Sequence, residues 1–214
     1  MSEEKKELER ERSAGEAAEE CPTEEKQSER LENSIYDWAR SLVAAVVGVV
    51  LLFTFLVRII GVSGPSMQDT LYTGDRILVL NAMFCDFQPG DVVVVNDYNA
   101  QLDDALVKRI IAVGGQTVDI DFVTGTVYVD GVALEEPYIK EPTYTTDGTV
   151  FPLTLAEDEV FIMGDNRNHS TDSRSTRLGP VKEGYIQGKA ILLLFPGETP
   201  DTEKRDWSRI GLIR

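Results

Sequence analysis

A chain of 214 residues with 42% hydrophobic residues can hold one full-sized domain together with accessory segments. The formal net charge of −16 excludes nucleic acid as a partner, since contact with phosphates needs clustered Lys and Arg. The two cysteines, Cys21 and Cys85, form no CxxC pair, and His169 is the single histidine. A metal site built on several of these ligands is therefore excluded.

Residues 1–37 have the composition of a solvated tail. Residues 1–34 hold twelve Glu against six Lys or Arg and almost no apolar side chain that could be buried. This pattern predicts disorder, and it also fits an exposed helix supported by Glu–Lys and Glu–Arg pairs at spacings of three and four. An acidic docking arm for a cytosolic partner is the functional alternative for the tail.

The next segment is apolar enough to cross a membrane. Residues 41–57 are seventeen in a row without a charge, and at about 1.5 Å per residue they extend over about 26 Å, close to the hydrocarbon thickness of a bilayer. The run starts too far from the first residue for a cleavable signal peptide and lacks the polar face of a core helix. We predict one transmembrane helix over 38–60, with the N-terminus in the cytoplasm and residues 61–214 outside.

The rest of the chain predicts a mainly β domain. Short β-branched or aromatic runs alternate with turn signals; the runs are DRILVL, DVVVVN, ALVKRIIAV, TVDID, GTVYVD, EVFIMG and KAILLLF. The segment TVDIDFVTGTVYVDG predicts a hairpin, with apolar positions alternating on both sides of Thr124-Gly125. Residues 134–156 carry three prolines and a glycine and predict a smaller excursion from the domain.

The first segment with catalytic residue types is SGPSMQDTL, which begins at Ser63, shortly after the apolar run. Gly64 and Pro65 place Ser66 in a tight turn. A serine on such a turn is a nucleophile when a base lies within reach. Taken alone, the segment also fits a plain linker between an anchor and a domain.

The second segment places two cations, Lys108 and Arg109, inside an apolar run. Alternation along a strand points them to opposite faces of a sheet, so that one of them faces inward. Burial lowers the pKa of a lysine and leaves a neutral amine that can take the proton of a serine hydroxyl. The competing interpretation is that both side chains project from an edge strand and prevent aggregation.

The third segment is a polar loop over residues 163–174, directly after the apolar run EVFIM. Its charged and hydroxyl side chains are Asp165, Arg167, Ser170, Asp172 and Arg174. Such a set can fix a loop through charge-assisted hydrogen bonds, and Ser170 can orient a neighbouring amine. A well-capped turn is the simpler interpretation of the same residues.

In this order behind a single anchor, the three segments resemble the type I signal peptidases, in their Gram-positive branch. SGPSMQDTL followed by GDRILV resembles the nucleophile box of that family, although residues 69–71 are Asp-Thr-Leu rather than Pro-Thr-Leu. VKRIIAVGGQTVD resembles its lysine box, with Gly-Gly-Gln at 114–116 in place of a Leu-Pro-Gly-Asp tract. GDNRNHSTDSR resembles nearly the whole of its third box. The resemblance covers residues 62–188 and the anchor.

The resemblance implies a β catalytic domain of the signal-peptidase and LexA-like type, with Ser66 as the nucleophile and Lys108 as its general base. It implies that Ser170 hydrogen-bonds the lysine amine and holds it toward Ser66. The oxyanion hole would use the backbone N–H of Ser66. Some members add a serine hydroxyl two residues earlier, where this chain has Gly64, so Gly64 is a secondary candidate and a further donor is expected elsewhere.

The same resemblance assigns a supporting role to three charged residues. Asp172 and Arg174 would form an ion pair that stabilises the site, with Arg109 as a neighbouring structural partner. His169 is not expected to act as the base, because Lys108 occupies the matching position. No metal and no cofactor is expected.

The implied activity is removal of N-terminal signal peptides from exported preproteins, with cleavage after small residues at −3 and −1. The implied partners are signal peptides of secreted preproteins and the lipid bilayer, close to the secretion translocon. Two alternatives remain. One is a non-catalytic membrane-anchored β domain, and the other is a self-cleaving Ser–Lys peptidase of the repressor type, which the acidic tail and the anchor disfavour because such proteins carry a DNA-binding head.

Overall fold

A computed structural model of the chain describes residues 24–96, 105–199 and 204–213, with side chains from residue 34 onward. Most of the predicted tail, including Cys21, lies outside these residues. The chain divides into two compact units, one ending at Val50 and one beginning at Leu51.

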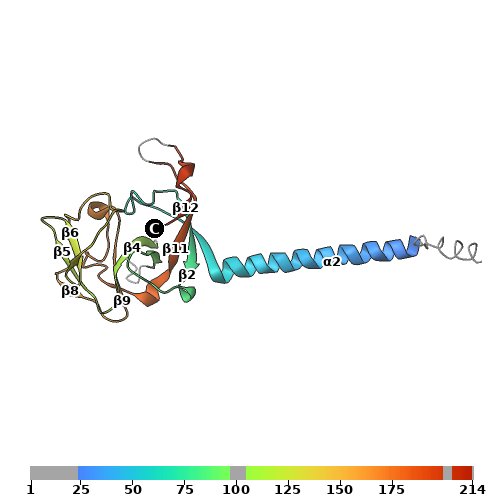
Figure 1. Cartoon of the computed structure of the whole chain (residues 1–214), viewed down its shortest axis with the longest axis horizontal. Coiled ribbons are helices and arrows are strands. Elements are labelled where there is room, and N and C mark those ends of the chain that lie inside the picture. The colour runs from blue at the N-terminus through green and yellow to red at the C-terminus, as the bar shows by residue number, and fades with distance from the viewer. Residues whose placement is uncertain (1–23, 97–104, 200–203, 214) are drawn as a thin grey trace, which may run out of the picture. The chain divides into compact units, whose positions relative to one another are not determined.

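The first unit is helical. Helix α2 (Glu24–Leu51) is followed without interruption by a π-helical turn, η1 (Leu52–Leu56) (Figure 1). Within them, the 23 residues Ser34–Leu56 are long and apolar enough to cross a membrane, with a mean hydropathy of 2.3 and none of the most apolar part buried. The described chain thus contains the N-terminal apolar helix that the sequence predicts.

The C-terminal end of this helix differs from the predicted span 38–60. Residues from Val57 onward leave the helix and form strand β1 (Val57–Gly61). The physical reason is pairing with β2 (Arg76–Asn81), with Ile59 opposite Leu78, because β-branched side chains fit a pleated surface better than a helix. The helical segment therefore ends at Leu56.

The second unit is mainly β, as predicted, and its larger sheet is antiparallel. In the described part of the chain this sheet has eight strands in the order β1-β2-β11-β3-β4-β9-β10, with β12 paired to β11. The remaining strands are β3 (Val92–Val95), β4 (Leu106–Ala112), β9 (Glu159–Met163), β10 (Val181–Lys182), β11 (Ile186–Phe195) and β12 (Gly211–Leu212). Strand β11 lies between β2 and β3, so a late segment of the chain is inserted between two early strands of the sheet.

The central strands of this sheet are buried on both faces. All four residues of β3 are buried, and successive residues enter different apolar clusters: Val92 and Val94 pack with Leu71 and Ile77, whereas the alternate valines pack with Ile110. Covered sheets of this kind have near-continuous apolar runs rather than an alternating polar face. Any charged side chain on these strands must therefore find partners inside the protein.

A second, four-stranded sheet has the order β7-β6-β5-β8 and lies to one side of β2 and β11 in Figure 1. Its strands are β5 (Thr117–Asp121), β6 (Thr126–Val129), β7 (Val132–Ala133) and β8 (Leu153–Thr154). The predicted hairpin is confirmed, with Val118 opposite Val129 and Gly125 at φ 76° in the turn. The excursion 134–156 joins this sheet, because β8 returns to pair with β5.

Short 3-10 helices are the remaining elements of the described chain after the apolar helix. These are the 3-10 turns η2 (Ala82–Phe84), η3 (Arg167–His169), η4 (Glu183–Tyr185) and η5 (Trp207–Arg209). One of them, η3, belongs to the polar loop that follows β9, and another, η5, precedes the last strand. Both lie at segments that contact the site described below.

The close approach of β11 to β2 gives a test of the fold. A Cβ atom on Gly188 would overlap the carbonyl oxygen of Leu80, whereas one on Gly184 would meet no described atom within 4 Å. Gly188→Ala should lower the free energy of unfolding by about 2 kcal/mol or more, because backbone cannot move aside as a flexible side chain can. Denaturant unfolding followed by circular dichroism measures this. Gly184→Ala is the matched control, and equal stability of the two variants would contradict the close approach of β11 to β2.

Candidate active site

Ser66 lies in a turn that we call the nucleophile turn, residues 63–71, directly after β1. Gly64 has φ 88°, a conformation that glycine adopts without strain. Met67 and Leu71 are buried in the core, and the Leu71 N–H donates to the Met67 carbonyl oxygen at 2.7 Å. These two side chains anchor the turn in the core, whereas Ser66 itself is half-buried.

The side chain of Lys108, on β4, contacts this turn. Its Nζ donates to Ser66 Oγ at 2.8 Å and to the Val107 carbonyl oxygen at 3.1 Å, and the residue is only 3% exposed. Burial lowers the pKa of Lys108 from 10.5 to about 8, against the opposing effect of nearby carboxylates, of which Asp172 has the largest influence. A lysine at this pKa is partly neutral near neutral pH, which is the form that can accept a proton.

The prediction that one of the two cations on β4 faces inward was incomplete, because both are buried. Arg109 is 1% exposed and donates through Nε and Nη2 to Asp165 at 2.9 and 2.7 Å, and through Nη1 to the Gly90 carbonyl oxygen at 2.7 Å. Its guanidinium also lies 4.0 Å from the ring centroid of Tyr138. The edge-strand interpretation is wrong, since β4 lies between β3 and β9.

The polar loop after β9 is seated against the nucleophile turn. The backbone N–H of Asn166 donates to the Ser66 carbonyl oxygen at 3.0 Å, and its side-chain Nδ2 donates to the Pro65 carbonyl oxygen at 3.1 Å. A Cβ on Gly164 would lie 2.5 Å from the Ser66 carbonyl oxygen and would overlap the Ser170 hydroxyl. Only glycine allows this contact. Sequence reasoning missed both Gly164 and Asn166, although both belong to the box GDNRNHSTDSR.

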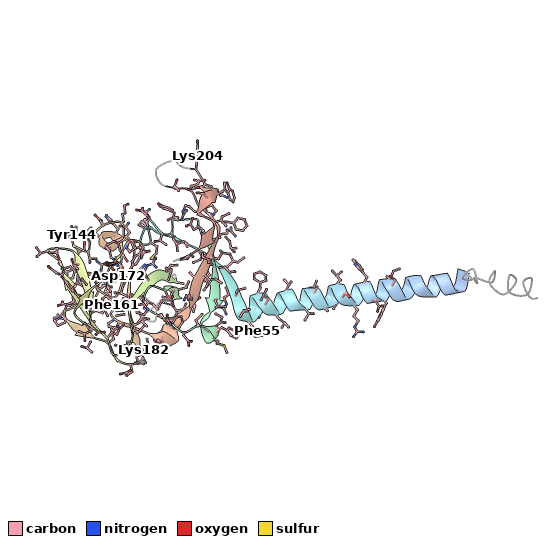
Figure 2. The ribbon with its side chains drawn as sticks, in the orientation of Figure 1. Phe55, Tyr144, Phe161, Asp172, Lys182 and Lys204 are labelled. Atoms are coloured by element: carbon pink, nitrogen blue, oxygen red, sulfur yellow. The ribbon has the colours of Figure 1, made fainter. Side chains whose placement is uncertain are left out.

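Asp172 and Arg174 form the ion pair that the resemblance implied. Arg174 donates through Nε to Asp172 Oδ1 and through Nη2 to Oδ2, each at 2.8 Å, and both residues are at most 2% exposed. The carboxylate also accepts from the Gly164 N–H at 3.0 Å, and Arg174 Nη2 donates to the Arg167 carbonyl oxygen at 2.5 Å. Figure 2 shows Asp172 within the β domain and Lys204 at its surface.

Ser170 does not make the hydrogen bond to Lys108 that the resemblance implied. Its Oγ is buried among the described residues without a hydrogen-bond partner. Lys108 Nζ instead directs its two hydrogen bonds to Ser66 Oγ and to the Val107 carbonyl oxygen. Ser170 nevertheless lies beside the site, because its Oγ and the Ser66 carbonyl oxygen both border Gly164. His169 is exposed, in the turn η3.

Residues from the second sheet's long connection hold the polar loop in place, which the sequence did not reveal. Glu136 accepts two hydrogen bonds from Arg167, at 2.5 and 2.9 Å. The side-chain oxygen of Asn168 accepts from the N–H groups of Tyr144 and Thr145 at 2.9 and 3.0 Å. The loop is therefore fixed on one side by this connection and on the other by the nucleophile turn.

The family model and the related sequences agree on one family. Residues 35–195 match the model of a family described as signal peptidase, peptidase S26. A signal peptidase I from Bacillus amyloliquefaciens is 34% identical over 181 residues, which are 80% of this chain and 94% of that protein. One from Mycobacterium tuberculosis is 31% identical and covers 77% of this chain and 74% of that protein. A crystal structure of a signal peptidase I from Enterococcus faecalis has 27% identity and a TM-score of 0.40, over 49% of this chain and 97% of that one.

The lowered pKa of Lys108 makes a prediction about stability. The folded chain loses the Lys108 proton at about pH 8, whereas the unfolded chain keeps it to 10.5. The cost of burying the charge is therefore complete below pH 8 and disappears as the pH rises through this window. Lys108→Met should be more stable than the wild type at pH 7, by about 3 kcal/mol, and this advantage should shrink as the pH approaches 10.5.

Denaturant unfolding at a series of pH values measures the difference between the two proteins. Lys204→Met is the matched control, since Lys204 is exposed and its loss should change stability little at any pH. An advantage of Lys108→Met that stays constant from pH 7 to 10.5 would contradict the proposed titration.

Proposed function

The chain belongs to the signal peptidase family, peptidase S26, and we propose that it is a Ser–Lys peptidase that removes signal peptides from exported preproteins. Ser66 is the nucleophile and Lys108 the general base. The observation that carries the proposal is the 2.8 Å hydrogen bond between Lys108 Nζ and Ser66 Oγ. Burial of the amine supports the assignment, because it provides the neutral form that a base requires.

In the proposed reaction, the neutral Lys108 amine takes the Ser66 hydroxyl proton while Oγ attacks the scissile carbonyl carbon. The tetrahedral intermediate collapses to an acyl-enzyme, and the Lys108 ammonium returns the proton to the amino group of the released mature protein. Lys108 then takes a proton from water as the water oxygen attacks the ester carbonyl carbon. The C–Oγ bond breaks, the Lys108 ammonium returns the proton to Ser66 Oγ, and the cleaved signal peptide leaves as a carboxylic acid. Each proton that Lys108 accepts is handed on within the same half-reaction.

Ser170 and the ion pair around it support this cycle. A neutral amine has two N–H bonds and an ammonium has three, so Lys108 gains a donor when it accepts the proton. That new N–H faces Ser66 Oγ, from which the proton came, and another N–H is taken by the Val107 carbonyl oxygen. The buried Ser170 hydroxyl, which has no partner among the described residues, is the acceptor we assign to the remaining N–H. Asp172 and Arg174 fix the loop that presents Ser170, and Arg109 fixes the same loop through Asp165.

The oxyanion of the intermediate is assigned to the backbone N–H of Ser66. Gly64 has no side-chain donor, and its carbonyl oxygen accepts from the Thr73 hydroxyl at 3.2 Å. Gly64 therefore remains a secondary candidate that acts, if at all, through its backbone N–H. The oxyanion-hole assignment rests on the position of Ser66 in the turn.

The apolar helix supports the membrane anchoring in the proposed arrangement, and the orientation is part of the proposal. Residues 1–33 are assigned to the cytoplasm, Ser34–Leu56 to the bilayer, and the β domain to the outer side, where it meets signal peptides close to the lipid surface and the secretion translocon. Ser66 follows the helix after a single strand, β1. Cleavage after small residues at −3 and −1 completes the proposal.

Cleavage of a preprotein with a small-X-small site by the detergent-solubilised full chain tests the dyad. Ser66→Ala and Lys108→Ala should each reduce kcat by about a thousandfold or more, as is usual for residues that act as a catalytic unit. Lys108→Arg should be as inactive as Lys108→Ala, since a guanidinium keeps the charge but cannot act as a base near neutral pH. His169→Ala is the control and should cleave at the wild-type rate. A wild type that is inert on several preproteins would favour a non-catalytic β domain instead.

A further inference from the structure

The C-terminal segment, residues 204–213, is attached to the domain beside the nucleophile turn. Strand β12 pairs antiparallel with β11, with Leu212 opposite Leu192. Ile213 packs against the apolar cluster that contains Met67 and Leu71, the two anchors of the turn. This segment lies beyond residues 35–195, the stretch that matches the family model, so that match assigns it no role.

Arg209 in this segment binds a buried carboxylate, that of Asp75, between the nucleophile turn and β2. Asp75 is 0% exposed, and Arg209 donates to its two oxygens through Nη1 at 3.1 Å and Nη2 at 2.7 Å. The same carboxylate accepts from the N–H groups of Tyr72 at 2.8 Å and Gly197 at 2.6 Å. Asp75 thus connects three segments: Tyr72 after the nucleophile turn, Gly197 in the loop that follows β11, and Arg209 in the C-terminal segment.

Arg209 also contacts the turn directly. Its Nη2 donates to the Thr70 carbonyl oxygen at 3.2 Å, and its guanidinium lies 4.3 Å from the ring centroid of Tyr72. The hydroxyl of Thr70 donates to Asp165 at 2.5 Å, and Asp165 is the partner of Arg109 on β4. Thr70 is therefore held from two sides, by the C-terminal segment and by the polar loop.

Only one turn of backbone separates Thr70 from Ser66, closed by the hydrogen bond from Leu71 to Met67. Lys108, by contrast, lies on β4, a different element of the fold from this turn. A shift of Thr70 and Asp75 would therefore change the distance between Ser66 and its base. We propose that Arg209 is a positioning residue, which holds the nucleophile turn so that Ser66 stays within hydrogen-bond distance of Lys108.

A purely structural role for the Arg209–Asp75 ion pair is the alternative, because removing one partner of a buried pair destabilises a protein. Arg209→Lys separates the two roles. A lysine keeps a cation beside Asp75, but a single ammonium cannot reproduce the planar fork that reaches both the carboxylate and the Thr70 carbonyl oxygen. Arg205→Met is the matched control, since Arg205 is an exposed cation of the same segment.

The kinetic experiment rests on the proposed function and uses the detergent-solubilised full chain with a preprotein substrate. Arg209→Lys and Arg209→Met should lower kcat by about tenfold to a hundredfold with KM changed less than about twofold, because the fault lies in the alignment of the reacting groups. Arg205→Met should match the wild type. Wild-type kcat in both Arg209 variants, or a loss that only follows the unfolded fraction in a thermal melt, would overturn the proposal.

Hydrogen exchange tests the same proposal without activity. In Arg209→Met, the backbone N–H groups of residues 70–75 should exchange about tenfold faster than in the wild type, while β3 and β9 are unchanged, because local opening follows the loss of local contacts. Equal exchange in the two proteins would overturn the positioning role. If Arg209→Met exchanges faster as predicted but the wild type cleaves no preprotein, the proposed function fails and the role of Arg209 in holding the turn stands.

Discussion

Lys108 is an amine that carries a charge in water and is held here in an interior that disfavours that charge. Strand β4 lies in the centre of the sheet with both faces covered, so Lys108 has almost no access to solvent. The carboxylates of Asp172 and Asp165 act against the loss of charge, yet burial dominates and lowers the pKa to about 8. The proposed role of Lys108 as the base for Ser66 near neutral pH depends on this burial.

The rest of the domain buries that amine and holds Ser66 within hydrogen-bond distance of it. Buried ion pairs are weak as sources of stability, because desolvation offsets much of their attraction. Here they serve to fix segments that regular strands cannot hold. Arg109 joins β4 to the polar loop, and Asp172 with Arg174 fixes the loop itself. Asp75 with Arg209 fixes the segment that follows the nucleophile turn. Together with the Arg167–Glu136 pair, these ion pairs connect β4, the polar loop and the segment that follows the nucleophile turn.

Much of this was predictable from sequence where the signal is local. The hairpin around Gly125, the apolar helix and the mainly β domain follow from patterns within a few residues of one another. The burial of both Lys108 and Arg109 was not predictable, because it depends on which strands flank β4 and on what covers each face. The missing bond of Ser170 and the contacts of Arg209 depend on distances between segments far apart in the chain. The predicted helix over 38–60 also extends past the observed end at Leu56, because the pairing of β1 with β2 is a non-local interaction.

The pH dependence of kcat/KM for preprotein cleavage by the full chain tests the Ser–Lys assignment most directly. The account predicts a rise on the acidic side with an apparent pKa of about 8, because only the neutral amine of Lys108 takes the Ser66 proton. The same acidic limb should be present in His169→Ala. A limb at about 6.5, the ordinary pKa of histidine, that disappears in His169→Ala would contradict the account. A profile that is flat from mildly acidic to alkaline pH would contradict it equally.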